Sequence, residues 1–155
     1  MNLRPIAHVL VIASLAGAML FGLRSYAADR VKTHHIAIQV DQNDPALMNL
    51  VLNNVENTAE YFNSKGEEAQ IEVVAFGPGL NMLREDKSPV KDRLKRIQEG
   101  SFPSTVKFSA CGVTRKKMEE AEGHAIPIVP EASMVASGVV RLTELQELGW
   151  SYIRP

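Results

Sequence analysis

The sequence predicts a single three-layer α/β/α domain with a mostly parallel sheet of about five strands. Short apolar segments alternate with amphipathic segments of helical period along most of the chain, a pattern typical of βαβ units with parallel strands. The 155 residues are 45% hydrophobic and 23% charged. That composition suits one domain with a real hydrophobic core and argues against a disordered or fibrous chain.

The N-terminal segment has the features of a secretory signal peptide. Arg4 precedes an apolar run from Val9 to Leu23, and the small residues Ser25 and Ala27 fit a cleavage site. The alternative is an uncleaved membrane anchor, because the apolar run is at the short end of the length that spans a bilayer. Both readings predict an exported, periplasmic-type location. The expected organisation is a signal peptide at 1–27, a loose tether at 28–33 and one domain at 34–155.

Charge and cysteine usage narrow the classes of function. Removal of the signal peptide would leave 15 of the 17 basic residues and all 18 acidic residues, a formal net charge of −3. This charge argues against a nucleic-acid partner. Exported proteins usually pair their cysteines, yet this chain has only Cys111. Cys111 is therefore an intermolecular bridge, a reactive thiol or a buried core residue.

The first strand and helix are expected between His34 and Gly66. The segment HHIAIQVD has strand character, and Asp44 as N-cap with Pro45 at the first position predicts a helix that ends near Gly66. Apolar residues recur at helical spacing on one side of this helix, and asparagines line the other. The stripe consists of Asn49, Asn53 and Asn57. It is typical of a wet helix face, although amides also suit a binding pocket or a subunit interface.

The rest of the chain continues the alternation. Ile71 to Phe76 reads as a strand buried on both faces, broken by a GPG turn and followed by a short helical piece at 80–85. Ser88 as N-cap and Pro89 predict a helix that ends at Gly100. After it we expect a strand through Val106, Phe108 and Ala110, a helix at 114–122, a short strand around 126–129, a helix at 139–148 and a final strand in WSYI.

Three segments are expected to meet at one edge of the sheet. In open parallel sheets, ligands bind outside the carboxyl ends of the strands. The segments are 41–44, the FGPGLN turn at 76–81 and ACGVTR at 110–115. Glycines of the turn permit a sharp bend whose amides can line a pocket. The candidate binding residues are Gly77, Gly79, Asn81, Gly112, Thr114, Arg115 and, from the asparagine stripe, Asn53.

Cys111 is the candidate catalytic residue. A thiol just before a helix start lies near the positive end of the helix dipole, and the cations at 115–117 also favour thiolate. Cations in a first turn oppose the dipole and cost up to about 1 kcal/mol each, which suggests that they hold an anion. The alternative is that Cys111 fills an apolar hole while the cations pair with Glu119, Glu120 and Glu122 along the helix.

No metal or cofactor is expected. Met82 occupies the position of the third glycine in a dinucleotide-binding fingerprint, and the turn has no P-loop lysine. His34 and His35 are adjacent in a strand, so alternation points them to opposite faces. No close cluster of metal ligands is apparent, and no local pattern joins a histidine and an acid to Cys111 as in a hydrolase triad.

Four segments together resemble the DsrE/DsrF-like family, which is associated with sulfur oxidation. They are IEVVAFGPGLNML, SPVKDRLKRI, KFSACGVTRKKM and GVVRLTELQELGWSYIRP, in this order, and the similarity covers about 34–155. The resemblance implies an α/β/α domain that forms homo- or hetero-oligomers, commonly trimers or hexamers. In the sulfur-relay members a cysteine carries sulfur as a persulfide, which assigns that role to Cys111.

The leading expectation is therefore an exported sulfur-handling protein in which Cys111 accepts or carries sulfane sulfur. Arg115 and nearby amides would attract a small anionic sulfur species, and a sulfur donor or acceptor protein is the implied partner. A carrier of this kind needs loading and unloading but no catalytic turnover. The alternative is a non-enzymatic anion-binding or assembly module with a structural Cys111. A third reading is a redox-responsive protein in which Cys111 bridges two chains.

Overall fold

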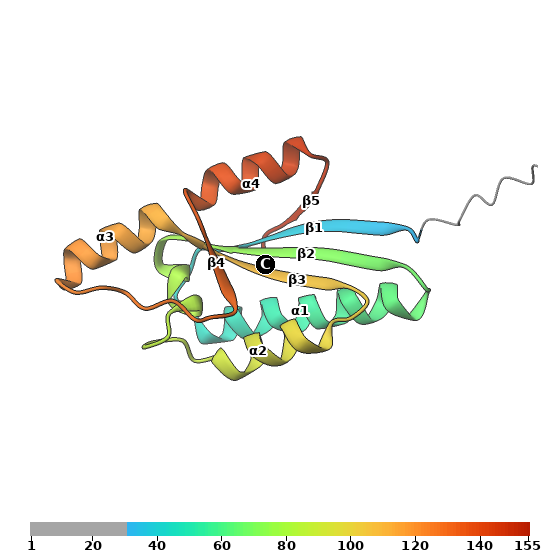
Figure 1. The fold of residues 1–155 in the computed structure, drawn as a ribbon, viewed down its shortest axis with the longest axis horizontal. Coiled ribbons are helices and arrows are strands. Elements are labelled where there is room, and N and C mark those ends of the chain that lie inside the picture. Colours follow the sequence, from blue (N-terminus) through green and yellow to red (C-terminus); the bar gives the residue numbers. More distant parts are fainter. Residues whose placement is uncertain (1–30) are drawn as a thin grey trace, which may run out of the picture. The chain divides into compact units, whose positions relative to one another are not determined.

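A computed structural model describes residues 31–155, so the expected signal peptide lies outside the described residues. The elements, in order, are β1 (Thr33–Val40), α1 (Pro45–Ser64), β2 (Glu68–Ala75), the 3-10 helix η1 (Gly77–Leu83), α2 (Lys91–Gly100), β3 (Thr105–Cys111), α3 (Gly112–Glu122), β4 (Ala132–Val135), α4 (Gly138–Glu147) and β5 (Ser151–Ile153). The five strands form one all-parallel sheet in the order β4-β3-β2-β1-β5, which confirms the predicted fold class (Figure 1). Among the described helices, none has the length and apolar character needed to cross a membrane.

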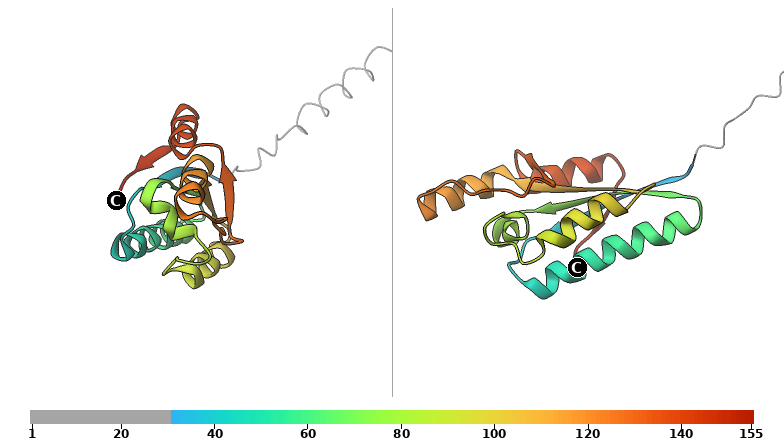
Figure 2. Two further views of the ribbon diagram at one scale, coloured as in Figure 1. Left: turned by 90° about the vertical axis from the view of Figure 1, so that its left-hand side faces the viewer. Right: turned by 60° about the horizontal axis from the view of Figure 1, so that its bottom comes forward.

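The order of the strands explains how the helices are distributed. The chain adds β2, β3 and β4 in turn to one side of β1 and then returns across the sheet to place β5 on the other side of β1. Crossovers between parallel strands are right-handed, so connections that run in opposite directions lie on opposite faces. Accordingly, α1 and α2 cover one face and α4 covers the other (Figures 1 and 2).

The two faces of the sheet bury very different amounts of apolar side chain. The main core lies between the sheet and α1, α2 and η1, and alternate strand residues such as Ile38, Val73 and Phe108 point into it. The core under α4 is small. It consists of Ala37, Val74, Leu142 and Leu145, with Phe76 and Trp150 packed at its margin. Few apolar contacts therefore hold α4 to the sheet.

An ion pair adds to the attachment of α4. Glu72 is in the central strand β2, and its side chain is only 2% exposed. Its carboxylate accepts hydrogen bonds from Arg141 Nε and Nη2, both at 2.8 Å, and from Ser109 Oγ at 2.7 Å. A buried carboxylate is stable only when it is paired and hydrogen-bonded. Arg141 of α4 provides this pairing.

The predicted start of α1 is correct, whereas the predicted start of α2 is two residues too early. Asp44 Oδ1 accepts the Ala46 amide at 2.8 Å, with Pro45 as the first helical residue. Helix α2 begins at Lys91 and not at Pro89, although it ends at Gly100 as predicted. The cause is local, because Ser88 Oγ accepts the Val90 amide within a turn that precedes the helix.

The predicted strand at 126–129 is wrong. The outer strand β4 is Ala132–Val135, in register with the end of β3. Residues 126–129 bury apolar side chains, but their backbone pairs with the segment after η1. The Glu85 amide donates to Pro127 O at 2.9 Å, and the Val129 amide donates to Leu83 O at 3.0 Å. Pro127 has no amide hydrogen to contribute to a sheet ladder.

Candidate functional site

Cys111 lies where two helices begin side by side. It is the last residue of β3, and Gly112 directly after it starts α3. The neighbouring strand β4 ends at Val135, the register partner of Cys111, and α4 begins at Gly138. The starts of α3 and α4 therefore meet at the carboxyl edge of the sheet (Figure 1). Both helices direct the positive ends of their dipoles toward this edge.

Groups from both helix starts favour negative charge on the sulfur. Cys111 is the N-cap of α3, and its Sγ accepts the Thr114 amide at 3.4 Å. The side chain of Thr114 and the backbone of Gly138 and Val113 also favour the ionised form of the thiol. Burial by itself would raise the pKa of Cys111, but these donors stabilise the thiolate and lower the pKa below its ordinary value.

The same thiol is nearly closed off from solvent. Cys111 is 3% exposed in the single chain. Reactive cysteines are usually partly accessible, whereas structural cysteines are buried. Cys111 thus combines the hydrogen bonds of a reactive thiol with the burial of a structural one.

Thr114 connects the turn after β2 to the cysteine. Its Oγ1 accepts the Gly77 amide at 2.9 Å, which joins the start of η1 to the first turn of α3. Gly77 has φ +51°, in the left-handed region that favours glycine. The structure therefore brings Gly77, Thr114 and Cys111 together, as the sequence indicated.

Gly79 and Gly112 lie at the same edge and permit close packing of the backbone. A Cβ at Gly79 would lie 2.3 Å from Val40 O, so η1 can approach the end of β1 only with glycine at this position. A Cβ at Gly112 would lie 3.1 Å from Val135 O, which is tight contact with β4. Both residues let backbone segments pack closely, Gly79 against the end of β1 and Gly112 against the end of β4.

A shallow, mainly apolar depression of about 540 Å³ lies between η1 and α3. Its lining includes Phe76, Pro78, Asn81, Thr114, Lys117 and Met118. Asn81 Nδ2 donates to Pro78 O at 3.0 Å, whereas its Oδ1 is buried without a hydrogen-bond partner among the described residues. A buried acceptor of this kind normally has a partner, so Asn81 Oδ1 is an unsatisfied polar atom in a residue that lines the depression.

The cations near the start of α3 pair mainly with acidic side chains of the same helix. Arg115 Nε lies 3.0 Å from Glu119 Oε1 and donates to Ile126 O, also at 3.0 Å. Lys116 lies 3.9 Å from Glu120. The alternative reading of the sequence, pairing along the helix, thus accounts for these two cations.

Asn53 is not part of this site. It lies exposed on α1, on the face of the sheet opposite α4, and its Oδ1 accepts Arg93 Nη2 at 2.9 Å. Asn49 Oδ1 accepts the same guanidinium at 2.8 Å. The asparagine stripe therefore contacts α2 through Arg93 and does not reach Cys111.

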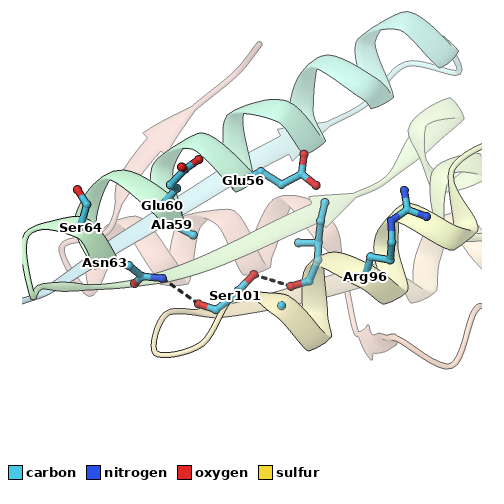
Figure 3. Close-up of a pocket in the computed structure, with 9 residues that line it drawn as sticks. Glu56, Ala59, Glu60, Asn63, Ser64, Arg96 and Ser101 are labelled. Atoms are coloured by element: carbon cyan, nitrogen blue, oxygen red, sulfur yellow. Dashed lines mark hydrogen bonds between the residues drawn. The ribbon is translucent and has the colours of Figure 1, made fainter.

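A second groove of about 540 Å³ lies between α1 and α2 (Figure 3). Its lining includes Glu56, Glu60, Asn63, Arg96 and Ser101, and Asn63 Nδ2 donates to Ser101 O at 3.2 Å. The groove follows the C-terminal turns of the two helices, which lie toward the amino edge of the sheet. It contains no nucleophilic cysteine and is separate from Cys111.

Within residues 31–155, no three His, Cys, Asp or Glu side chains gather where they could hold a metal ion. The two strand histidines point to opposite faces of the sheet, as predicted. His34 stacks on Phe62 of α1 with ring centroids 3.6 Å apart, and His35 contacts Trp150 edge-on at 5.1 Å.

Comparison with known proteins supports the fold and supplies no activity. No protein-family model matches the chain, and no curated protein sequence matches it. A similar solved structure is that of the protein of unknown function MTH1491 from Methanobacterium thermoautotrophicum. It is 29% identical with a TM-score of 0.66, and the match covers 79% of this chain and 99% of the other. The chain therefore resembles an uncharacterised α/β protein.

Sequence reasoning missed two residues, Glu72, which pairs with Arg141 of α4, and Gly138, which begins α4 beside the thiol. Glu72 had a signal, since an acid within an otherwise buried strand requires a partner. Gly138 had none, because its amide reaches Cys111 only through the adjacency of β3 and β4.

Proposed function

We propose that this protein is an exported member of the DsrE/DsrF-like family that carries sulfane sulfur on Cys111 as a persulfide. The observation that supports the proposal best is the setting of Cys111 Sγ, which accepts the Thr114 amide at 3.4 Å and lies where the amide donors of α3 and α4 begin. These donors favour thiolate, the form of cysteine that attacks sulfur. The four sequence motifs supply the family context.

The proposed loading step is a transfer of one sulfur atom. The Cys111 thiolate attacks the outer sulfur of a persulfide donor RSSH and forms a new sulfur–sulfur bond. The donor's sulfur–sulfur bond breaks, its proton stays on the outer sulfur, and RS⁻ leaves. Cys111 becomes a neutral persulfide, and no external oxidant or reductant is required.

Assembly of several copies is part of the proposal. Helix α3 has no buried residue in the single chain, and Val113 at its start is 49% exposed. A helix that buries no apolar stripe in its own chain is unusual in a globular protein. We therefore propose a homo-oligomer, trimeric or hexameric, in which a neighbouring chain covers α3 and a donor or acceptor protein engages the carboxyl edge.

The direct test is the intact mass of the purified protein after exposure to inorganic polysulfide. The expected result is an added sulfur atom that a reductant removes and that Cys111→Ser never acquires. Folded protein that gains no sulfur at Cys111 would overturn the proposal.

The 3% exposure of Cys111 and the unpartnered Asn81 Oδ1 favour a second candidate, a non-enzymatic binding module with a structural cysteine. This candidate predicts that sulfite or thiosulfate raises the melting temperature equally in the wild type and in Cys111→Ala. Stabilisation that is lost in Cys111→Ala would instead favour the sulfur carrier.

A further inference from the structure

Thr114 lies between two fixed groups, the Gly77 amide and the Cys111 sulfur. The Gly77 amide donates to Thr114 Oγ1 at 2.9 Å, and the amide of Thr114 itself donates to Cys111 Sγ at 3.4 Å. Two residues of one helical turn are thereby joined to a loop that follows a different strand. The geometry restricts both the backbone and the side chain of Thr114.

The contact with Gly77 determines which way the hydroxyl proton points. A threonine hydroxyl has one proton to donate and two lone pairs that accept. Gly77 N–H occupies one acceptor position of Oγ1, which leaves the proton to point toward another acceptor, and the Thr114 side chain lowers the pKa of the Cys111 thiol, whose Sγ lies 3.4 Å from the Thr114 amide. A hydrogen bond to an ionised acceptor is stronger than one to a neutral acceptor.

Most charged side chains on the surrounding elements have partners of their own. On α3, Arg115 pairs with Glu119 and Lys116 with Glu120, while Lys117 borders the depression beside η1. On the α4 side of the sheet, Glu72 binds Arg141 and lies 3.7 Å from Lys107. Among the described residues, the hydrogen bond that the sulfur accepts comes from a neutral group, the Thr114 amide.

We infer that Thr114 is a positioning residue for Cys111: the Gly77 amide holds the Thr114 hydroxyl so that its proton is donated to Sγ. This inference rests on the proposed function and deepens it. During loading, the hydroxyl stabilises the thiolate before it attacks. During unloading, an acceptor thiolate R′S⁻ attacks the outer sulfur of Cys111–S–SH, R′S–SH forms, and the hydroxyl stabilises the Cys111 thiolate that leaves.

The test compares variants at this position by the pH dependence of Cys111 alkylation with iodoacetamide. Thr114→Val keeps the shape and the backbone amide and removes the hydroxyl, and Thr114→Ser keeps the hydroxyl. Thr143→Val is the matched control, because Thr143 is an exposed helical threonine of α4 whose hydroxyl donates to Val139 O. Thr114→Ala is a second variant without the hydroxyl, and far-UV circular dichroism with a urea midpoint checks the fold of each protein.

We expect Thr114→Val and Thr114→Ala to shift the alkylation midpoint upward by about one pH unit, which is about a tenfold loss of thiolate well below the midpoint. Thr114→Ser and Thr143→Val should titrate like the wild type. A folded Thr114→Val or Thr114→Ala protein that keeps the wild-type midpoint overturns the inference. A wild-type midpoint equal to that of the urea-unfolded protein also overturns it.

Failure of the inference and failure of the proposed function are separable. An upward shift in Thr114→Val supports the positioning role even if polysulfide adds no sulfur to Cys111, in which case only the carrier function fails. If Thr114→Val forms the persulfide and keeps the wild-type alkylation midpoint, only the positioning role of Thr114 fails and the carrier function stands.

Discussion

The backbone of Gly138 lowers the pKa of the Cys111 thiol, although Gly138 begins α4 and Cys111 precedes α3. The contact exists because β3 and β4 are adjacent parallel strands that end together, with Cys111 opposite Val135. Amides from two helix starts thus stabilise negative charge on one sulfur atom.

Gly138→Ala should raise the pKa of Cys111. An added Cβ would lie 2.8 Å from Phe76 Cβ, so the start of α4 must move and weaken the contact of its amide with the sulfur. The measurement is the alkylation midpoint compared with the wild type. Gly123→Ala is unsuitable as a control because Gly123 has φ +73°, whereas Gly100→Ala adds a Cβ with open space around it. An unchanged midpoint in folded Gly138→Ala would count against a role for the α4 amide.

Glu72→Gln should destabilise the domain by about 3 kcal/mol, because it removes the charge that pairs with Arg141 in a mostly buried site. Urea unfolding measures the change as a lower midpoint. Glu144→Gln is the matched control, because Glu144 contacts the same arginine at 3.3 Å from a side chain that is 53% exposed. Its effect should be no more than about 1 kcal/mol. Equal effects of the two variants would show that the buried pair has no special importance for α4.

Gly79→Ala should destabilise the protein by about 3 kcal/mol, the upper end of overpacking effects, because the obstructing atoms are the backbone of Val40 and Asp41. Gly100→Ala provides the comparison, since it is the last residue of α2 and its Cβ would meet nothing within 4 Å. That variant should be neutral or more stable by up to about 1 kcal/mol. A Gly79→Ala protein as stable as the wild type would mean that η1 can move away from β1 at little cost.

The pH dependence of the free energy of unfolding should include a contribution from Glu122, which pairs with Arg84 and Lys87. Hydrogen bonds from Arg84 and Lys87 lower the pKa of Glu122 to about 2, from an ordinary value of 4.5. Between these values the unfolded chain binds more protons at Glu122 than the folded chain, so this contribution is present above about pH 4.5 and is lost as the pH falls toward 2.

The measurement is the urea midpoint of the wild type and Glu122→Gln from pH 7 to pH 2. The wild type should be more stable at pH 7, and the difference should shrink through the acidic window. Glu99→Gln, at an exposed position of α2, is the control for the loss of a surface carboxylate. A constant difference between the wild type and Glu122→Gln at every pH would contradict the assignment.

Local patterns were sufficient for most of the fold. The Asp44 cap, the period of α1 and the alternating apolar strands predict their elements directly, because each signal acts over a few neighbouring residues. The one wrong strand, at 126–129, has the right apolar content. Its backbone instead pairs with Leu83 and Glu85, which are distant from it in the sequence, so the local pattern does not reveal this pairing.

The sequence by itself determined the α/β class, the position of Cys111 at a strand end before a helix, and the nearness of Gly77 and Thr114 to that edge. Only the tertiary structure decided that β4 adjoins β3 and that α4 therefore begins beside the thiol. It also decided that Asn53 faces α2 and that Glu72 binds Arg141. The physical reason is that strand order and crossover direction are set by long-range packing, so contacts between helix starts cannot be read from the residues next to Cys111.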